Sequence, residues 1–331
     1  KGCGEVSGLD AGGNQMTEAI DRAKLGAMLE TMLLIRAHEE KAAAMQAAGQ
    51  AAGTCTAVGQ EAAAVGVVSA LGADDLILTN HRSAGHLLAR GADPARICAE
   101  VLGKATGYCK GKSGSLHISA KELGVVLTST IVGAELSLAA GVGLAASMQQ
   151  RDSVVACFFG DGAACEGAFH ESLNLAAVWK LPILYVCENN QWQAFVHRRE
   201  TMPMDHVSTW AASHGMEAAT VDGNDVEAVY RAAQAGIAHI RATGQPYFLE
   251  TYTYRLRGHY EPDDQGYVDP EELAAWRLQD PIDRLQTKLG LSAPEIRALH
   301  ARASQRIDSA WETAVAAPYP NLAELTADVY A

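Results

Sequence analysis

The chain has 331 residues, which allows about two domains or one large domain. A content of 48% hydrophobic and 20% charged residues, with only 10 prolines, excludes the disordered, collagen-like and disulfide-rich miniature classes. The formal charge of −13 argues against nucleic acid or an anionic membrane as the main partner.

Hydropathy and cysteine content point to a cytoplasmic protein. The longest uncharged stretch near the middle, Leu136 to Gln150, is shorter than the ~20 apolar residues that cross a bilayer. The seven cysteines are an odd number and include no Cys-x-x-Cys pair. We therefore expect a reducing, cytoplasmic setting and no membrane segment.

The first half of the chain has the pattern of helices joined by glycine-containing loops. Residues 1–16 lack periodicity and are expected to form a flexible arm. Apolar residues three and four apart predict a helix from Thr17 to about Ala48. Up to Gln150 we expect helical pieces, with binding residues in the polar loops 53–61, 79–86 and 107–117.

From Asp152 onward the pattern changes to alternating strands and helices. Strands are predicted at 153–159 and 183–187, with a helix at about 166–179 between them. This βαβ unit predicts parallel strands joined by a right-handed crossover. A further unit follows, with a turn at 221–224, a helix at about 225–241 and a strand at 247–254.

The last part of the chain is predicted to be a polar loop followed by helices. Residues 257–269 are too charged to be buried unaided and form a candidate mobile loop over a ligand. Asp269-Pro270 and Asp280-Pro281 place an acidic cap before a first-turn proline, and Ser292 with Glu295 has capping-box spacing.

Two polar residues follow the strands of the βαβ unit directly. Asp161 and Asn190 should therefore lie together at the carboxyl edge of a parallel sheet, where open α/β sheets bind ligands. Gly160 and Gly162 let a phosphate approach the backbone at the start of the next helix. A carboxylate and an amide oxygen suit magnesium, so the pair predicts a magnesium-bridged diphosphate.

The spacing excludes the two common nucleotide motifs. A dinucleotide fingerprint would need glycine at Cys165, and a P-loop ending at Gly111-Lys112-Ser113 would need glycine at Thr106. Gly160-Asp161-Gly162, followed after the next apolar strand by Asn189-Asn190, instead has the order of the thiamine-diphosphate signature.

The segment GDGAACEGAFHESLNLAAVWKLPILYVCENN resembles the alpha subunit of the first, thiamine-diphosphate-dependent component of 2-oxo acid dehydrogenase complexes. The resemblance covers roughly residues 20–300 and includes the pyruvate, branched-chain and acetoin enzymes. It implies an α/β thiamine-diphosphate-binding domain at 17–260, in which helices flank a parallel sheet. It also implies an N-terminal helical extension, and a loop and C-terminal helical extension at 261–331 that packs on partner subunits. Further matching motifs are VGQEA from Val58, GKSGSLH from Gly111, Ile131-Val132-Gly133, VDGND from Val221 and Tyr254-Arg255-x-Arg257-Gly258-His259.

Matching positions imply a set of site residues. Magnesium would be held by Asp161, Asn190 and the backbone carbonyl of Trp192. The other cofactor-binding positions are His81, Arg82, Ile131, Val132, Gly160, Gly162 and Ala163, with Arg82 on the diphosphate and Val132 under the thiazolium ring. His259 would face the reacting carbon and transfer a proton, since an imidazole titrates near neutral pH.

Three of these residues have a plain alternative when taken alone. Arg82 would be a surface charge, Val132 a core residue and His259 a surface-loop histidine. The surrounding motifs favour the functional roles.

Several positions depart from the family pattern. Pyruvate-type relatives usually carry a histidine where this chain has Thr54-Cys55-Thr56-Ala57, and the Tyr-Arg-x-His-Gly pattern is altered around Ala84. His86 is a candidate replacement for the lost imidazole. Thr130 and Tyr260 replace an asparagine and a serine that are common in relatives, so the substrate side is changed more than the cofactor side.

The chain has one diphosphate module and no second sheet of the same kind, which indicates half of a shared active site. In the family, a beta subunit supplies the glutamate that activates the cofactor, so we expect two alpha and two beta chains. The leading hypothesis is decarboxylation of a 2-oxo acid or cleavage of acetoin, with transfer to a lipoyl acyltransferase. The alternatives are a two-subunit carboligase that forms acyloins and a non-catalytic scaffold subunit.

Overall fold

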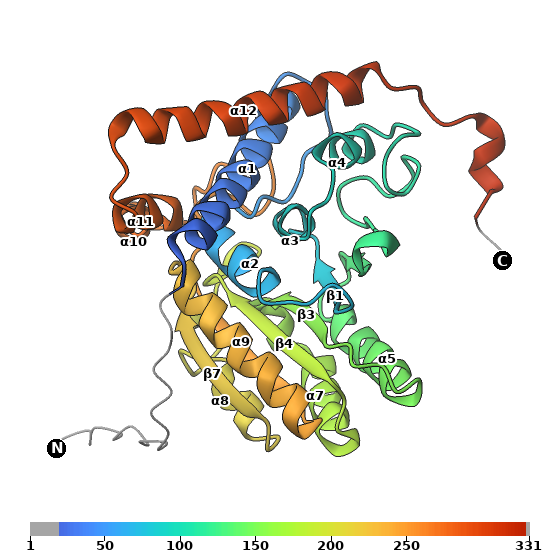
Figure 1. The fold of residues 1–331 in the computed structure, drawn as a ribbon, viewed down its shortest axis with the longest axis vertical. Coiled ribbons are helices and arrows are strands. Elements are labelled where there is room, and N and C mark those ends of the chain that lie inside the picture. The colour runs from blue at the N-terminus through green and yellow to red at the C-terminus, as the bar shows by residue number, and fades with distance from the viewer. Residues whose placement is uncertain (1–19, 329–331) are drawn as a thin grey trace.

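A computed structural model describes residues 20–328 and contains a six-stranded, wholly parallel sheet (Figure 1). The strand order is β2-β1-β3-β4-β8-β7, and each neighbouring pair runs parallel. The predicted α/β class and βαβ unit are therefore confirmed. The strands are β1 (Leu76–Asn80), β2 (Val125–Ser129), β3 (Val155–Gly160), β4 (Ile183–Asn189), β7 (Glu217–Asp222) and β8 (Tyr247–Tyr252).

Alternating side chains of the central strands build one core on each face of the sheet. In β3, Ala156 and Phe158 join the core that contains α1, α2 and α9, while Val155, Cys157 and Phe159 join the core that contains α5 and α7. All five side chains are fully buried, as expected for a parallel sheet that helices cover on both faces. The helices around the sheet, counting both faces together, are α1 (Arg22–Ala47), α2 (Glu61–Val68), α3 (Ala84–Ala89), α5 (Ala134–Met148), α6 (Asp161–Ala164), α7 (Gly167–Trp179), α8 (Ser208–Ala212) and α9 (Val226–Thr243).

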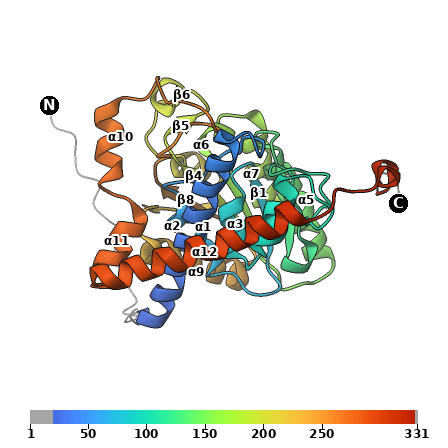
Figure 2. The same cartoon turned by 90° about the horizontal axis from the view of Figure 1, so that it is seen from above.

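The C-terminal helices form a layer over the N-terminal ones. In Figures 1 and 2, α12 (Ala293–Ala316) crosses α1 and α4 (Pro94–Val101) of its own chain. The predicted caps are confirmed: Asp269 begins α10 (Pro270–Arg277), Asp280 begins α11 (Pro281–Lys288), and Ser292 with Glu295 forms the capping box of α12. That the segment 261–331 also packs on partner subunits stays a prediction.

Short elements complete the chain between residues 20 and 328. A two-stranded antiparallel hairpin, β5 (Trp192–Gln193) with β6 (Val196–His197), follows β4. No helix of the described chain has the length and hydropathy to cross a membrane. Single 3₁₀ turns lie at Lys121–Leu123, Arg198–Glu200 and Leu322–Thr326.

The structure adds two strands that were not predicted and corrects two predicted boundaries. Strands β1 and β2 lie in the region 49–150, where only helical pieces were expected, because a five-residue apolar run does not distinguish a strand from a buried helix. The predicted turn 221–224 starts later, since Val221 and Asp222 still pair with β8. The helix predicted from Thr17 starts at Arg22 behind the N-cap Asp21, and the arm 1–16 lies outside the described residues.

Gly59, in the loop before α2, is held in a conformation that side chains rarely adopt. Its φ is +97°, and a Cβ there would lie 2.6 Å from the carbonyl oxygen of Tyr254 and 2.7 Å from Cγ of Leu256. We expect Gly59→Ala to lower the free energy of unfolding by about 2–3 kcal/mol, measured by urea denaturation. Gly49→Ala is the control, because Gly49 has φ +69° but nothing within 4 Å of the added Cβ. Equal losses in both variants would contradict the steric explanation.

Candidate active site

Asp161 lies at the carboxyl end of β3, and its carboxylate is inaccessible to solvent. It is the first residue of α6, is fully buried, and follows Gly160 in extended conformation. Neither carboxylate oxygen has a hydrogen-bond partner within residues 20–328. Burial raises the pKa of Asp161 from 3.8 to about 6. A buried carboxylate without a partner is the arrangement expected where a cation binds.

Asn190 follows the neighbouring strand β4 and is held in a tight turn. Its Nδ2 donates to Oε1 of Gln60 at 3.1 Å, and its Oδ1 accepts from the backbone N–H of Trp192 at 3.1 Å. The preceding Asn189 donates to Oε1 of the buried Glu250 at 2.6 Å, which anchors the turn to β8. The order of β3 and β4 in the sheet thus brings Asn190 to the same edge as Asp161.

A cavity of about 430 Å³ opens at this edge of the sheet. Its lining residues come from seven separate segments of the chain. All but one of the predicted site residues line it, namely His81, Arg82, Ile131, Val132, Gly160, Asp161, Gly162, Ala163, Asn190, Trp192 and His259.

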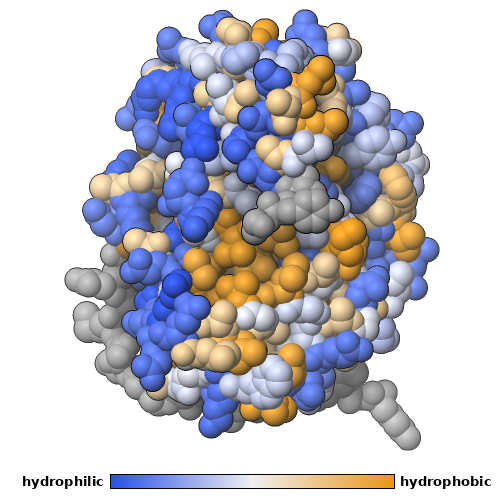
Figure 3. Space-filling model, turned by 90° about the vertical axis from the view of Figure 1, so that its right-hand side faces the viewer, coloured by the Kyte–Doolittle hydropathy of each residue, from blue (hydrophilic) through white to orange (hydrophobic). Residues whose placement is uncertain are grey.

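Ile131 and Val132 lie bare on the wall of this cavity. Their exposed fractions are 66% and 53%, so the explanation of Val132 as a core residue does not hold. They directly precede α5, at the right of Figure 1, and Figure 3 shows an apolar hollow at the centre of the face on that side. Exposed apolar surface of this kind marks a ligand or partner site.

Arg82 is a buried clamp rather than a surface charge. Its Nη1 donates to the carbonyl of Thr56 at 2.5 Å. Its Nη2 donates to both the carbonyl oxygen and Nδ1 of His259, each at 3.0 Å. Arg255 is also buried, and its Nη1 has no hydrogen-bond partner in the described chain. Of the two, only Arg82 lines the cavity, but both positive charges act on the His259 ring. The Arg82 guanidinium group suits a diphosphate.

His259 reaches the cavity from a loop that is tied down at several points. Its backbone N–H donates to Oδ2 of Asp263 at 2.6 Å, and its ring lies edge-on to that of His81 at 5.7 Å. Burial and the charges of Arg82 and Arg255 lower its pKa from 6.5 to about 4. The ring is therefore neutral at pH 7 in the protein alone, whereas its residue type suggests titration near neutral pH.

His86 is the one predicted catalytic residue that does not line the cavity. Only 1% of its surface is exposed, and its ring packs 4.1 Å from that of Phe158. Nδ1 lies 2.8 Å from Oγ1 of Thr79, and Nε2 lies 3.0 Å from Oε1 of Glu188, which does line the cavity. His86 therefore contacts a residue of the cavity wall, Glu188, but does not reach the cavity itself.

The chain matches the family model described as Dehydrogenase E1 component over residues 29–323. It is 40% identical over 307 residues to the alpha subunit of an acetoin:2,6-dichlorophenolindophenol oxidoreductase from Bacillus subtilis (strain 168), with 92% of each chain covered. This chain belongs to the dehydrogenase E1 component family. The resemblance inferred from the sequence is confirmed.

Two further relatives are also named as alpha subunits, one of a pyruvate dehydrogenase and one of an acetoin oxidoreductase. The alpha subunit of the pyruvate dehydrogenase E1 component from Rhizobium meliloti (strain 1021) is 36% identical over 304 residues, which is 90% of this chain and 87% of that protein. A second acetoin:2,6-dichlorophenolindophenol oxidoreductase alpha subunit, from Cupriavidus necator, is 38% identical over 277 residues, covering 82% and 83% of the two chains.

The cavity of this E1 chain fits the cofactor that its family implies, thiamine diphosphate. The buried guanidinium group of Arg82 suits the diphosphate, and the bare Ile131 and Val132 suit an apolar ring. Alpha subunits of these complexes work with a beta subunit, which agrees with the open, apolar side of the cavity (Figure 3).

Sequence reasoning missed several polar residues of the E1 cavity, among them Gln60 and Glu135. Glu135 is 2% exposed, its Oε2 has no hydrogen-bond partner among the described residues, and burial raises its pKa from 4.5 to about 7. The signal was present, since Glu135 is a single acid at the start of a long uncharged helix. Gln60 belongs to the VGQEA motif, but no role in the site was predicted for it.

Glu135→Gln is expected to stabilise the cofactor-free E1 chain in a pH-dependent way. The unfolded carboxyl releases its proton near pH 4.5, whereas the folded one retains it to about pH 7, so wild-type stability falls between these values. Urea denaturation should show a gain of up to about 3 kcal/mol at pH 8 and little change at pH 5. Glu312→Gln, at an exposed residue of α12, is the control. The same gain at both pH values would contradict the explanation.

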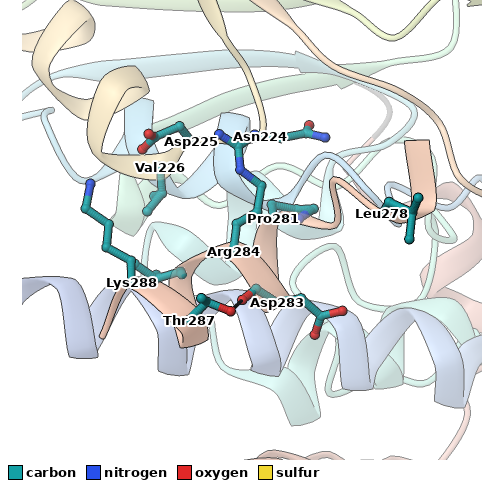
Figure 4. Close-up of a pocket in the computed structure, with 10 residues that line it drawn as sticks. Asn224, Asp225, Val226, Leu278, Pro281, Asp283, Arg284, Thr287 and Lys288 are labelled. Carbon is teal, nitrogen blue, oxygen red and sulfur yellow. Dashed lines mark hydrogen bonds between the residues drawn. The ribbon is translucent and has the colours of Figure 1, made fainter. Parts of the chain in front are cut away.

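A second cavity of this E1 chain, of about 390 Å³, lies between α11 and the start of α9 and is lined by ion-paired side chains (Figure 4). Arg284 and Lys288 extend from α11 toward the start of α9. Arg284 pairs with Asp222 at 2.7 Å and Lys288 with Glu227 at 2.5 Å, so both cations are neutralised. These ion pairs join the C-terminal helices to the edge of the sheet.

Proposed function

We propose that this chain is the alpha subunit of a thiamine-diphosphate-dependent enzyme that cleaves acetoin or decarboxylates a 2-oxo acid. It would act in an assembly of two alpha and two beta chains and pass the product group to a lipoyl acyltransferase. The observation that carries the proposal is the buried, unpartnered carboxylate of Asp161 in the cavity that also contains Asn190, Arg82 and His259.

The donor set of the cavity suits magnesium. Asp161, Asn190 and the backbone carbonyl of Trp192 are hard oxygen ligands, which leave the remaining positions to diphosphate oxygens and water. Arg82 would neutralise part of the remaining diphosphate charge. When bound, thiamine diphosphate supplies a carbon nucleophile and an electron sink for cleavage of a carbon–carbon bond.

The remaining residues orient the substrate and manage protons. His259 presents a neutral imidazole whose Nδ1 accepts a hydrogen bond from Arg82. The ring hydrogen is therefore on Nε2, the nitrogen that would exchange a proton with the substrate. Glu188, buried and bonded to His86, adds a carboxylate to the cavity wall. Acetoin is the favoured donor because the relatives at 40% and 38% identity carry acetoin in their names.

The reducing compartment also belongs to this proposal. All six cysteines of the described chain are free. Their number and burial support a cytoplasmic setting.

The function is tested with the chain co-purified with its beta subunit, thiamine diphosphate and magnesium. Acetoin, pyruvate and branched 2-oxo acids are supplied in turn, and both reduction of 2,6-dichlorophenolindophenol and formation of acyloins are followed. Dye reduction with acetoin is the expected result. Acyloin formation without dye reduction would move the protein to the carboligases, and no turnover of any donor would contradict an enzymatic role.

A further inference from the structure

A small chamber adjoins the catalytic cavity. Its volume is about 20 Å³, enough for one water molecule. Cys55 and His81 line both the chamber and the cavity, so they form the partition between the two. The other walls come from α1, the loop before α3, α4 and the segment 115–118, which lie far apart in the sequence.

Three buried polar atoms of the residues that line the chamber lack a hydrogen-bond partner in the described chain. They are Oγ1 of Thr54, Nε2 of His81 and Oγ of Ser83. Thr54 is 7% exposed and Ser83 is 1% exposed. Buried polar atoms in folded proteins nearly always have a partner, and a buried water typically makes about three hydrogen bonds.

We propose that the chamber binds one ordered water molecule through Thr54, His81 and Ser83, and that this water holds the His81 ring in place against His259. The presence of a ring nitrogen among the three partners favours water over a hard cation, which takes oxygen ligands. The proposed water makes Thr54 and Ser83 positioning residues, since neither lines the catalytic cavity.

The link to catalysis runs through the two histidine rings. His81 lines the cavity, and its ring meets that of His259 edge-on at 5.7 Å. A His81 ring that lost its water would rotate more freely and leave His259 with a looser neighbour. This consequence for turnover rests on the proposed function, whereas the binding of the water does not.

The sign of a stability change separates a hydrated chamber from a dry one. If a water is bound, Ser83→Ala removes one of its hydrogen bonds and lowers the melting temperature of the alpha–beta enzyme. If the chamber is dry, the same change removes an unsatisfied hydroxyl and raises the melting temperature. Thr251→Val is the matched control, because it removes a buried hydroxyl that donates to the carbonyl of Cys187 at 3.3 Å, outside the chamber. A rise in Ser83→Ala with a fall in Thr251→Val would overturn the proposal.

A conservative pair at Thr54 tests the positioning role. Thr54→Ser keeps the hydroxyl and should retain wild-type turnover, whereas the isosteric Thr54→Val should lower kcat about tenfold with unchanged KM and cofactor affinity. A crystal structure of the wild-type enzyme should show density within about 3.2 Å of all three atoms, and Thr54→Val should weaken it. Absence of that density, or equal kcat in the two variants, would contradict the proposal. If no donor is turned over at all, the density and the melting temperatures still decide whether the water is bound.

Discussion

Replacing Asp161 with asparagine is expected to abolish magnesium-dependent binding of thiamine diphosphate to the alpha–beta enzyme. The carboxylate is fully buried without a protein partner, so the cation is the charge that it is placed to meet. An amide keeps the size of the side chain but removes its charge. Isothermal titration calorimetry with and without magnesium should show affinity reduced at least about 100-fold.

The same substitution should have the opposite effect on the cofactor-free chain. Asparagine no longer carries a buried charge, so the melting temperature in EDTA is expected to rise. Asp308→Asn, at a half-exposed carboxylate on α12, serves as the control and should change neither quantity. Unchanged cofactor binding in Asp161→Asn would refute the metal assignment, and a lower melting temperature in EDTA would point to a folding defect.

His259→Asn is expected to lower kcat by about 10²- to 10⁴-fold while cofactor affinity stays near that of the wild type. Asparagine can still hydrogen-bond to Arg82, but it has no ring nitrogen that can transfer a proton. Steady-state kinetics with the preferred donor measure the effect.

Tyr260→Phe is the control for the His259 prediction. Tyr260 is the next residue of the same loop and is 46% exposed, so its change tests disturbance of the loop alone. A similar loss in both variants, or a loss confined to KM in His259→Asn, would argue against a proton-transfer role.

The meeting of Asp161 and Asn190 is predictable because it depends only on local order. Each residue follows a strand, and parallel neighbouring strands end at the same edge of the sheet. No contact over long range has to be known. For the same reason the helix caps Asp269, Asp280 and Ser292 are predicted correctly, since a cap involves only the next three residues.

The position of His86 is not predictable in this way. Its spacing from Arg82 is compatible with either face of a short helix, and the packing of its ring on Phe158 of β3 decides between them. Glu135 enters the cavity for a similar reason, because the packing of the core brings α5 to this edge of the sheet. Strands β1 and β2 were missed because their five residues are too few to show a period.

The loop that carries His259 is joined to the loop before α2 by main-chain hydrogen bonds. Leu256 donates its N–H to the carbonyl of Val58 at 3.1 Å, and Glu261 donates to that of Thr54 at 2.9 Å. Bonds between backbone atoms do not depend on which side chains the residues carry. The side chains that face the substrate can therefore differ between relatives while the His259 imidazole stays in the same position. New donor preferences can then evolve without a change in the backbone that holds His259.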